Sequence, residues 1–144
     1  MNEIIETTWK GNMAFEATID GFSVKMDAHK NFGGTEFGPR PKPYVLSALA
    51  GCTAMDVISI LNKKKIVPAE FRLFVDGNLT DEHPKIYKTI VVTYEFRGEN
   101  WKDDPAILAA VTRAVQLSTD NYCGVNAMLK GSCDISHEIR ILNL

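Results

Sequence analysis

The longest apolar stretch, from Tyr44 to Leu61, places the strongest constraint on how this chain can fold. A helix of about 20 apolar residues can cross a bilayer, and this stretch comes close to that length. Polar residues interrupt it, and the charge of Asp56 would be costly at the centre of a bilayer. The stretch therefore predicts a helix in a protein core, buried on most of its sides, with no membrane partner.

Composition indicates an ordinary globular protein. The chain has 144 residues, a net charge of −2, 45% apolar residues and 24% charged residues. This length is typical of one domain, 1–144. The mild acidity argues against a nucleic-acid partner. The N-terminus carries Glu3 and Glu6 where a signal peptide would be basic, so we expect a cytoplasmic, reducing location.

The pattern of strand and helix signals predicts an α+β domain. Three β-forming segments, 4–10, 14–19 and 22–27, are separated by Gly11-Asn12 and Asp20-Gly21, which suit tight turns of an antiparallel meander. A loop rich in Gly and Pro follows, and Pro43 suits the first turn of a helix that runs to about Lys65. The remaining segments read as strands 71–79 and 85–97, a helix from Pro105, a short helix 124–130 and a strand 133–142.

Cys52 lies in the middle of the predicted long helix, among small residues. One interpretation is a buried, inert thiol in a closely packed helix, since free cysteine is among the most buried residue types. The other is a nucleophile. Asp56 lies one turn later on the same face, where a carboxylate raises the pKa of a thiol. Activation of Cys52 would therefore need a cation, and Arg40 is the nearest candidate by sequence.

Cys123 stands where the short helix should begin. A thiolate at that place would be favoured by unpaired N–H groups, although a packed thiol is an equally good interpretation. Cys133 lies in a predicted strand and is expected to be a packing or surface residue. We expect no metal and no cofactor, because the chain has no Cys-x-x-Cys pair, no histidine pair at helical spacing, no P-loop and no dinucleotide fingerprint.

Two longer segments, 38–61 and 114–129, resemble the two cysteine segments of the OsmC/Ohr family. The similarity is greatest to the branch of OsmC-like proteins whose central helix reads Gly-Cys-Thr/Ser-Ala-Ile/Met-Asp-Val, and it covers essentially the whole chain. The resemblance implies an OsmC-like fold. In that fold, antiparallel sheets wrap around two central helices in an intertwined homodimer.

The resemblance also implies a thiol peroxidase that reduces organic hydroperoxides in oxidative stress defence. By position, Cys52 would be the peroxidatic cysteine and Cys123 the resolving one, although helix position alone favours Cys123 as the thiolate. A dithiol such as dihydrolipoamide would be the reductant.

The sequence departs from the family pattern at Pro43, which occupies the place of a family carboxylate, commonly Glu. That acid normally positions an arginine from the N-terminal strands, and here Arg40 is the first arginine of the chain. Arg40 is therefore the candidate that activates Cys52. An alternative function is a non-peroxidatic OsmC-like protein that binds a hydrophobic small molecule at the dimer interface.

Overall fold

A computed structural model describes all residues from Met1 to Leu144 and forms two compact units, Met1–Val45 and Leu46–Leu144. Each unit holds one three-stranded sheet, which confirms the predicted α+β class. The elements, in chain order, are β1 (Glu6–Trp9), β2 (Phe15–Ile19), β3 (Phe22–Met26), η1 (Lys30–Phe32), α1 (Pro41–Lys63), β4 (Glu70–Leu79), β5 (Tyr87–Gly98), α2 (Pro105–Leu117), η2 (Ser118–Tyr122), α3 (Gly124–Leu129) and β6 (Asp134–Asn143).

The first unit is the predicted antiparallel meander, with strand order β1-β2-β3. Asp20 and Gly21 join β2 to β3, and both have positive φ angles, 50° and 82°. Two consecutive positive φ angles are the mark of a type I′ turn, whose twist matches that of the strands it joins. The turn residues and the β-forming segments in the sequence were therefore sufficient to predict this part of the fold.

The carboxylate of Asp27 organises the loop that follows β3. Its Oδ2 accepts hydrogen bonds from the backbone N–H groups of Thr35 at 2.8 Å and Phe37 at 3.0 Å, and its Oδ1 accepts from Ala28 at 2.7 Å. These bonds, led by the one from Thr35, hold the pKa of Asp27 below its usual value. The Gly- and Pro-rich loop thus has a defined shape although it contains only a single 3₁₀ turn, η1.

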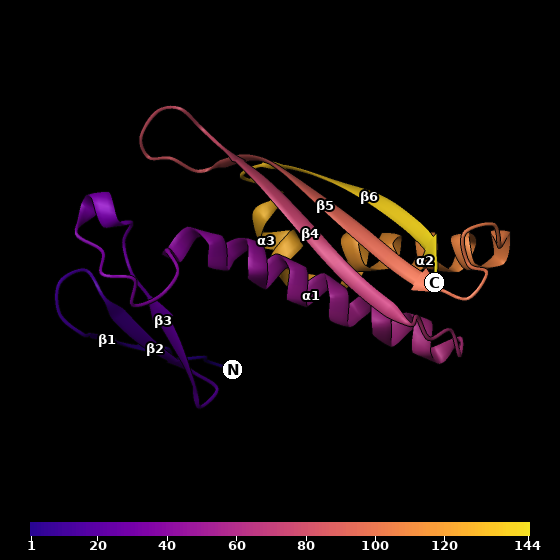
Figure 1. Ribbon diagram of the computed structural model, residues 1–144, viewed down its shortest axis with the longest axis horizontal. Coiled ribbons are helices and arrows are strands. Elements are labelled where there is room, and N and C mark those ends of the chain that lie inside the picture. The colour runs from indigo at the N-terminus through magenta and orange to yellow at the C-terminus, as the bar shows by residue number, and fades with distance from the viewer. The chain divides into compact units, whose positions relative to one another are not determined.

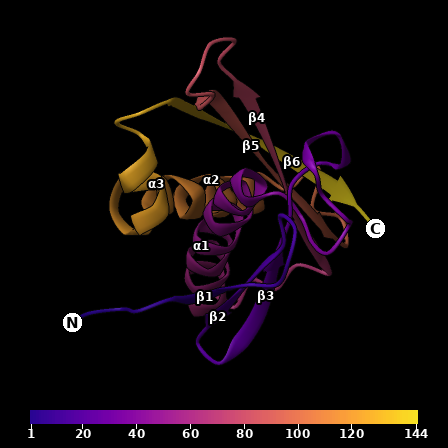
Figure 2. The ribbon, with the colours of Figure 1, turned by 90° about the vertical axis from the view of Figure 1, so that its left-hand side faces the viewer.

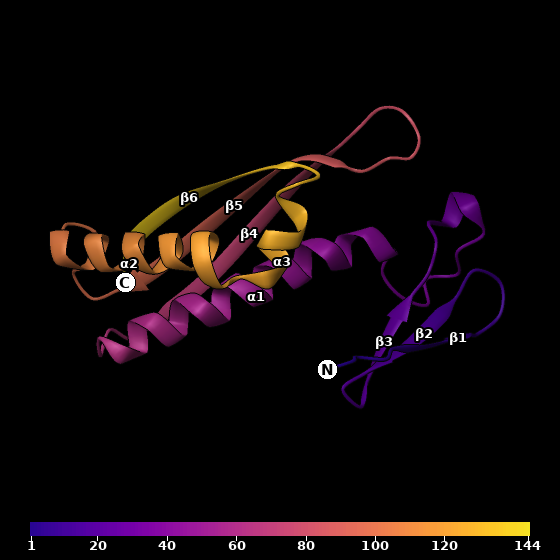
Figure 3. The same ribbon diagram turned by 180° about the vertical axis from the view of Figure 1, so that it is seen from behind.

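In the second unit, the strand order is β4-β5-β6 (Figure 1). Strands β4 and β5 pair antiparallel, whereas β5 and β6 pair parallel, which corrects the expectation of wholly antiparallel sheets. The parallel pairing follows from the long connection through α2 and α3, since a short hairpin cannot join parallel strands. The helices of this unit lie on one face of the sheet (Figures 2 and 3).

Helix α1 is buried along a single stripe, which contradicts the prediction that it is buried on most of its sides. The buried residues follow a four-residue spacing: Leu49, Thr53, Val57 and Leu61. In its most apolar 18-residue window only 22% of residues are buried, and Met55 is 74% exposed. By length and composition α1 could also cross a membrane, but the core helix of a soluble protein meets the same criterion. The sequence pattern revealed that α1 is apolar. It did not reveal which side of α1 is buried against the rest of the same chain.

Helix α2 begins where the sequence predicts, at Pro105. Proline suits the first helical position because its missing N–H has no intrahelical partner there. The side chain of Asp104 caps the helix by accepting hydrogen bonds from the backbone N–H groups of Ala106 and Ile107. The π-helical turn η2 follows α2 directly and ends at Tyr122, the residue before Cys123.

Candidate functional site

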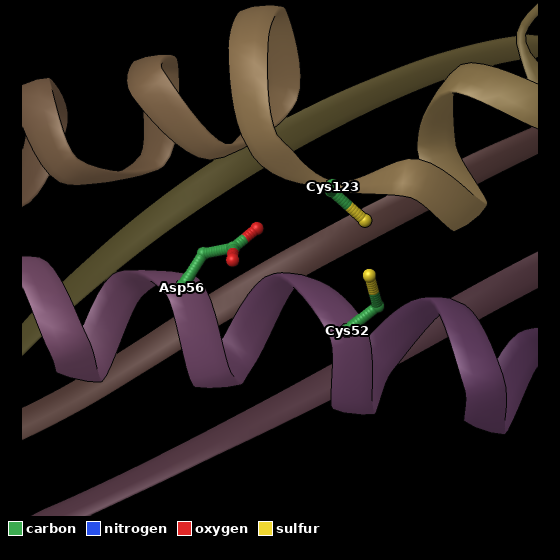
Figure 4. A group of neighbouring side chains, drawn as sticks. All are labelled: Cys52, Asp56 and Cys123. Carbon is green, nitrogen blue, oxygen red and sulfur yellow. The ribbon is translucent and has the colours of Figure 1, made fainter. Parts of the chain in front are cut away.

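Cys52, Asp56 and Cys123 form a compact cluster between α1 and the start of α3 (Figure 4). The two sulfur atoms and a carboxylate oxygen of Asp56 all lie within 4.8 Å of one another. Both cysteines are free thiols, and their side chains point toward each other from the two facing segments. The structure therefore brings together the two cysteines that the sequence places far apart.

Cys52 occupies the side of α1 that faces Cys123, and Asp56 follows one turn later. This four-residue spacing places both side chains on one face of a helix. Cys52 is half-buried, whereas one interpretation of the sequence expected a buried thiol. Cys52 thus lies on a regular stretch of α1 and is partly exposed as a residue.

Cys123 is the N-cap of α3, and its sulfur accepts a hydrogen bond from the backbone N–H of Asn126 at 3.3 Å. The predicted position at a helix start is thus confirmed. Burial raises the pKa of Cys123 to about 11, with further increases from Cys52 and Asp56, which favours the packed thiol of the two interpretations that the sequence left open. The residue is only 3% exposed, and removal from water outweighs one N–H donor from a short helix.

A chain of hydroxyl groups leads through the core to Asp56. The Tyr94 hydroxyl lies 2.7 Å from the Thr53 Oγ1, which lies 2.8 Å from the Ser118 Oγ. Ser118 donates to Asp56 Oδ2 at 2.8 Å. Because a carboxylate only accepts, the directions are fixed: Tyr94 donates to Thr53, and Thr53 donates to Ser118. Burial raises the pKa of Tyr94, which keeps this first donor protonated.

Sequence reasoning missed this hydroxyl chain. Thr53, Tyr94 and Ser118 come from α1, β5 and η2, and all three are almost fully buried. Their positions in the sequence carry no shared spacing, so only the packing of three elements reveals them. The one available signal was Thr53 itself, a polar residue on the apolar side of the predicted long helix.

One pocket reaches Asp56 of the cluster, and another reaches the hydroxyl chain. The first, of about 500 Å³, is lined by five residues of α1 and by Leu117 and Tyr122; the α1 residues are Asp56, Ser59, Ile60, Lys63 and Lys64. The other, of about 340 Å³, includes Thr53 and Tyr94 from the hydroxyl chain together with His137 and Lys130. The first pocket gives solvent a route to the carboxylate end of the cluster.

Cys133, His137 and Arg40 are not members of the cluster of Cys52, Asp56 and Cys123. Cys133 donates to the backbone carbonyl of Leu129 at 3.4 Å, and burial raises its pKa, so it is a packing residue as expected. His137 packs edge-on against the Tyr94 ring, with 6.3 Å between the ring centroids. Arg40 directly precedes α1 and belongs to the first unit, whereas the cysteines belong to the second. Its role in activating Cys52 stays a prediction.

Comparisons with known proteins agree on one family. The model of the OsmC-like protein family matches residues 32–138. The chain is 31% identical over 125 residues to Protein YhfA of Escherichia coli strain K12, with 87% of each chain covered.

Among solved structures, a hypothetical protein from Aquifex aeolicus has a TM-score of 0.80 and 27% identity and covers 99% of this chain and 98% of its own. The organic hydroperoxide resistance protein OhrB of Bacillus subtilis has a TM-score of 0.66 over 96% of this chain and 98% of its own. At 16% identity, the match to OhrB shows a shared fold alone.

Proposed function

Because the chain belongs to the OsmC-like protein family, we propose that it reduces organic hydroperoxides with Cys52 and Cys123 and is recycled by a dithiol. The observation that carries this proposal is the approach of two free thiols within 4.8 Å, one in the middle of α1 and the other at the start of α3. The fold shared with a hydroperoxide resistance protein supports the same reaction class.

The difference in exposure between the two thiols supports Cys52 as the peroxidatic cysteine and Cys123 as the resolving one. Cys52 is half-buried and Cys123 is 3% exposed, so a hydroperoxide reaches Cys52 first. The Cys52 sulfur attacks the outer oxygen of the hydroperoxide, the O–O bond breaks, and the alkoxide leaves as an alcohol after it takes up a proton. Cys52 is thereby oxidised to a sulfenic acid.

Cys123 then resolves the sulfenic acid. Its sulfur attacks the Cys52 sulfur, a disulfide forms and water leaves with the thiol proton. A disulfide needs Cα atoms about 4.4–6.8 Å apart, and a small shift of the short helix α3 can supply any remaining approach. A dithiol such as dihydrolipoamide returns the disulfide to two thiols by exchange and is itself oxidised to a disulfide.

We further propose that the working protein is a homodimer in which Arg40 helps to activate Cys52. The support for a dimer is the exposed apolar side of α1, which one chain leaves without cover. The support for Arg40 is its position directly before α1 as the first arginine of the chain. A symmetric pair is the commonest closed assembly.

Steady-state consumption of cumene hydroperoxide with dihydrolipoamide tests the proposed function. We expect the wild type and Cys133→Ser to turn over, Cys52→Ser to lose all consumption above background, and Cys123→Ser to be oxidised without being recycled by the dithiol. Equal consumption by the wild type and Cys52→Ser would contradict the proposal. That result would favour the alternative function, binding of a hydrophobic small molecule, which the departure at Pro43 keeps open.

A further inference from the structure

We propose that Cys52, Asp56 and Cys123 also form a binding site for a divalent zinc ion in the reduced protein. The site uses the same thiols as the proposed peroxide chemistry but does not depend on it, because metal binding requires only that both thiols are reduced. The ion would be held by two sulfur atoms and one carboxylate oxygen.

The ligand types and their spacing suit zinc. Cysteine sulfur and aspartate oxygen are common zinc ligands, and three protein ligands plus one open position are typical of zinc sites that exchange a ligand. Cys52 and Asp56 are four residues apart on α1, so both side chains face the same way, and the fold adds Cys123 from the start of α3. The sequence does not indicate this set, because its residues form neither a Cys-x-x-Cys pair nor a histidine pair at helical spacing.

The distances are compatible with one ion. Zinc bonds of about 2.3 Å to sulfur and 2.0–2.2 Å to oxygen place tetrahedral ligand atoms about 3.5–3.8 Å apart. The three ligand atoms lie within 4.8 Å of one another before any ion draws them together. Rotation of side chains at the two facing segments can supply the remaining contraction, at most about 1.3 Å.

Groups around the cluster hold two of its ligands in place. Ser118 fixes Asp56 through Oδ2, which leaves Oδ1 available to a metal, and Thr53 and Tyr94 fix Ser118 in turn. The backbone N–H of Asn126 orients the sulfur of Cys123. Hydrogen bonds of this kind, from outer groups to the ligands, set ligand orientation and metal affinity in zinc sites.

The pocket of about 500 Å³ beside Asp56 can supply the fourth ligand as a water molecule. Two thiolates and one carboxylate give the zinc complex a net charge of −1, and Lys63 and Lys64 line the same pocket. Binding releases one proton from each thiol. The metal and a Cys52–Cys123 disulfide exclude each other, since the disulfide leaves no thiolate to coordinate.

Cobalt(II) binding to the reduced protein, free of peroxide, tests the proposal, because Co²⁺ is a spectroscopic substitute for Zn²⁺. We expect one equivalent of Co²⁺ per chain, sulfur-to-cobalt charge-transfer absorption, the visible bands of a tetrahedral site, and displacement of Co²⁺ by one equivalent of Zn²⁺. Cys133→Ser should bind like the wild type. Cys52→Ser and Cys123→Ser should lose stoichiometric binding, and Ser118→Ala should weaken affinity about 10–100-fold.

Serine keeps the N-cap at position 123, and circular dichroism checks that each variant is folded. A measurement on the unmodified chain complements the variants: Zn²⁺ should slow alkylation of Cys52 by iodoacetamide and leave that of Cys133 unchanged. The proposal fails if the reduced wild type gives no charge-transfer absorption, if both cysteine variants keep it, or if Cys133→Ser loses it. None of these results depends on peroxidase turnover.

Discussion

The Oγ of Ser118 donates a hydrogen bond of 2.8 Å to Oδ2 of Asp56 and thereby joins the start of η2 to the middle of α1. This bond is the last link of a hydroxyl chain that begins at Tyr94 and passes through Thr53. It fixes the carboxylate that lies beside the two thiols. The buried core and the candidate site thus share one polar network.

Ser118→Ala should lower the free energy of unfolding by about 1–3 kcal/mol, because it leaves the buried hydroxyl of Thr53 without its acceptor and Asp56 without its donor. Urea unfolding followed by circular dichroism measures the change. Ser59→Ala is the matched control, since Ser59 is an exposed serine on α1 and its removal should change stability by less than about 0.5 kcal/mol. Equal effects of the two substitutions would mean that the network contributes nothing measurable.

Asp27→Asn should lower the free energy of unfolding at neutral pH. The difference in this free energy between the wild type and the variant should become smaller in acid. An amide offers one acceptor oxygen in place of the two that receive the N–H groups of Ala28, Thr35 and Phe37. The pKa of Asp27 is lowered from 3.8, so its contribution is fully present above that pH and is lost as the pH falls through the lower, folded value. Unfolding measured from pH 7 downward tests this. A difference in the free energy of unfolding between the two proteins that stays constant down to the lowest pH would contradict this prediction.

Gly51→Leu should weaken the proposed dimer without unfolding the chain. A Cβ at Gly51 meets no atom within 4 Å, so one chain has room for a larger side chain there. Leucine is also a better helix former than glycine by about 0.8–1 kcal/mol. We expect a second copy packed on this side of α1 to be displaced, which sedimentation velocity at micromolar concentration would detect as a shift toward monomer. A wild type that sediments as a stable monomer would overturn the dimer itself.

Much of the fold could be predicted from the sequence, because its local signals agree with the final structure. The Asp20-Gly21 turn, Pro105 at the start of α2 and the alternation in β4 each act over a few residues and need no tertiary context. The parallel pairing of β5 with β6 could not be predicted in this way, since it depends on how α2 and α3 cross the sheet.

In the candidate site, too, some residues could be predicted from the sequence and others depend on tertiary packing. Cys52 and Cys123 could be named from the sequence, and their proximity follows from the resemblance to a known family. The hydroxyl chain through Thr53, Tyr94 and Ser118 could not, because three separate elements contribute it. The sequence also left Cys123 open between a thiolate and a packed thiol, since a position at a helix start carries no information about burial.

Peptide mapping after one equivalent of cumene hydroperoxide tests the central claim most directly, because it reads out the bond that the two thiols are proposed to form. We predict an internal disulfide between Cys52 and Cys123, with Cys133 left as a free thiol, and no such link in Cys52→Ser. A disulfide that contains Cys133, over-oxidation of Cys52 without a link, or no change at all would contradict the account.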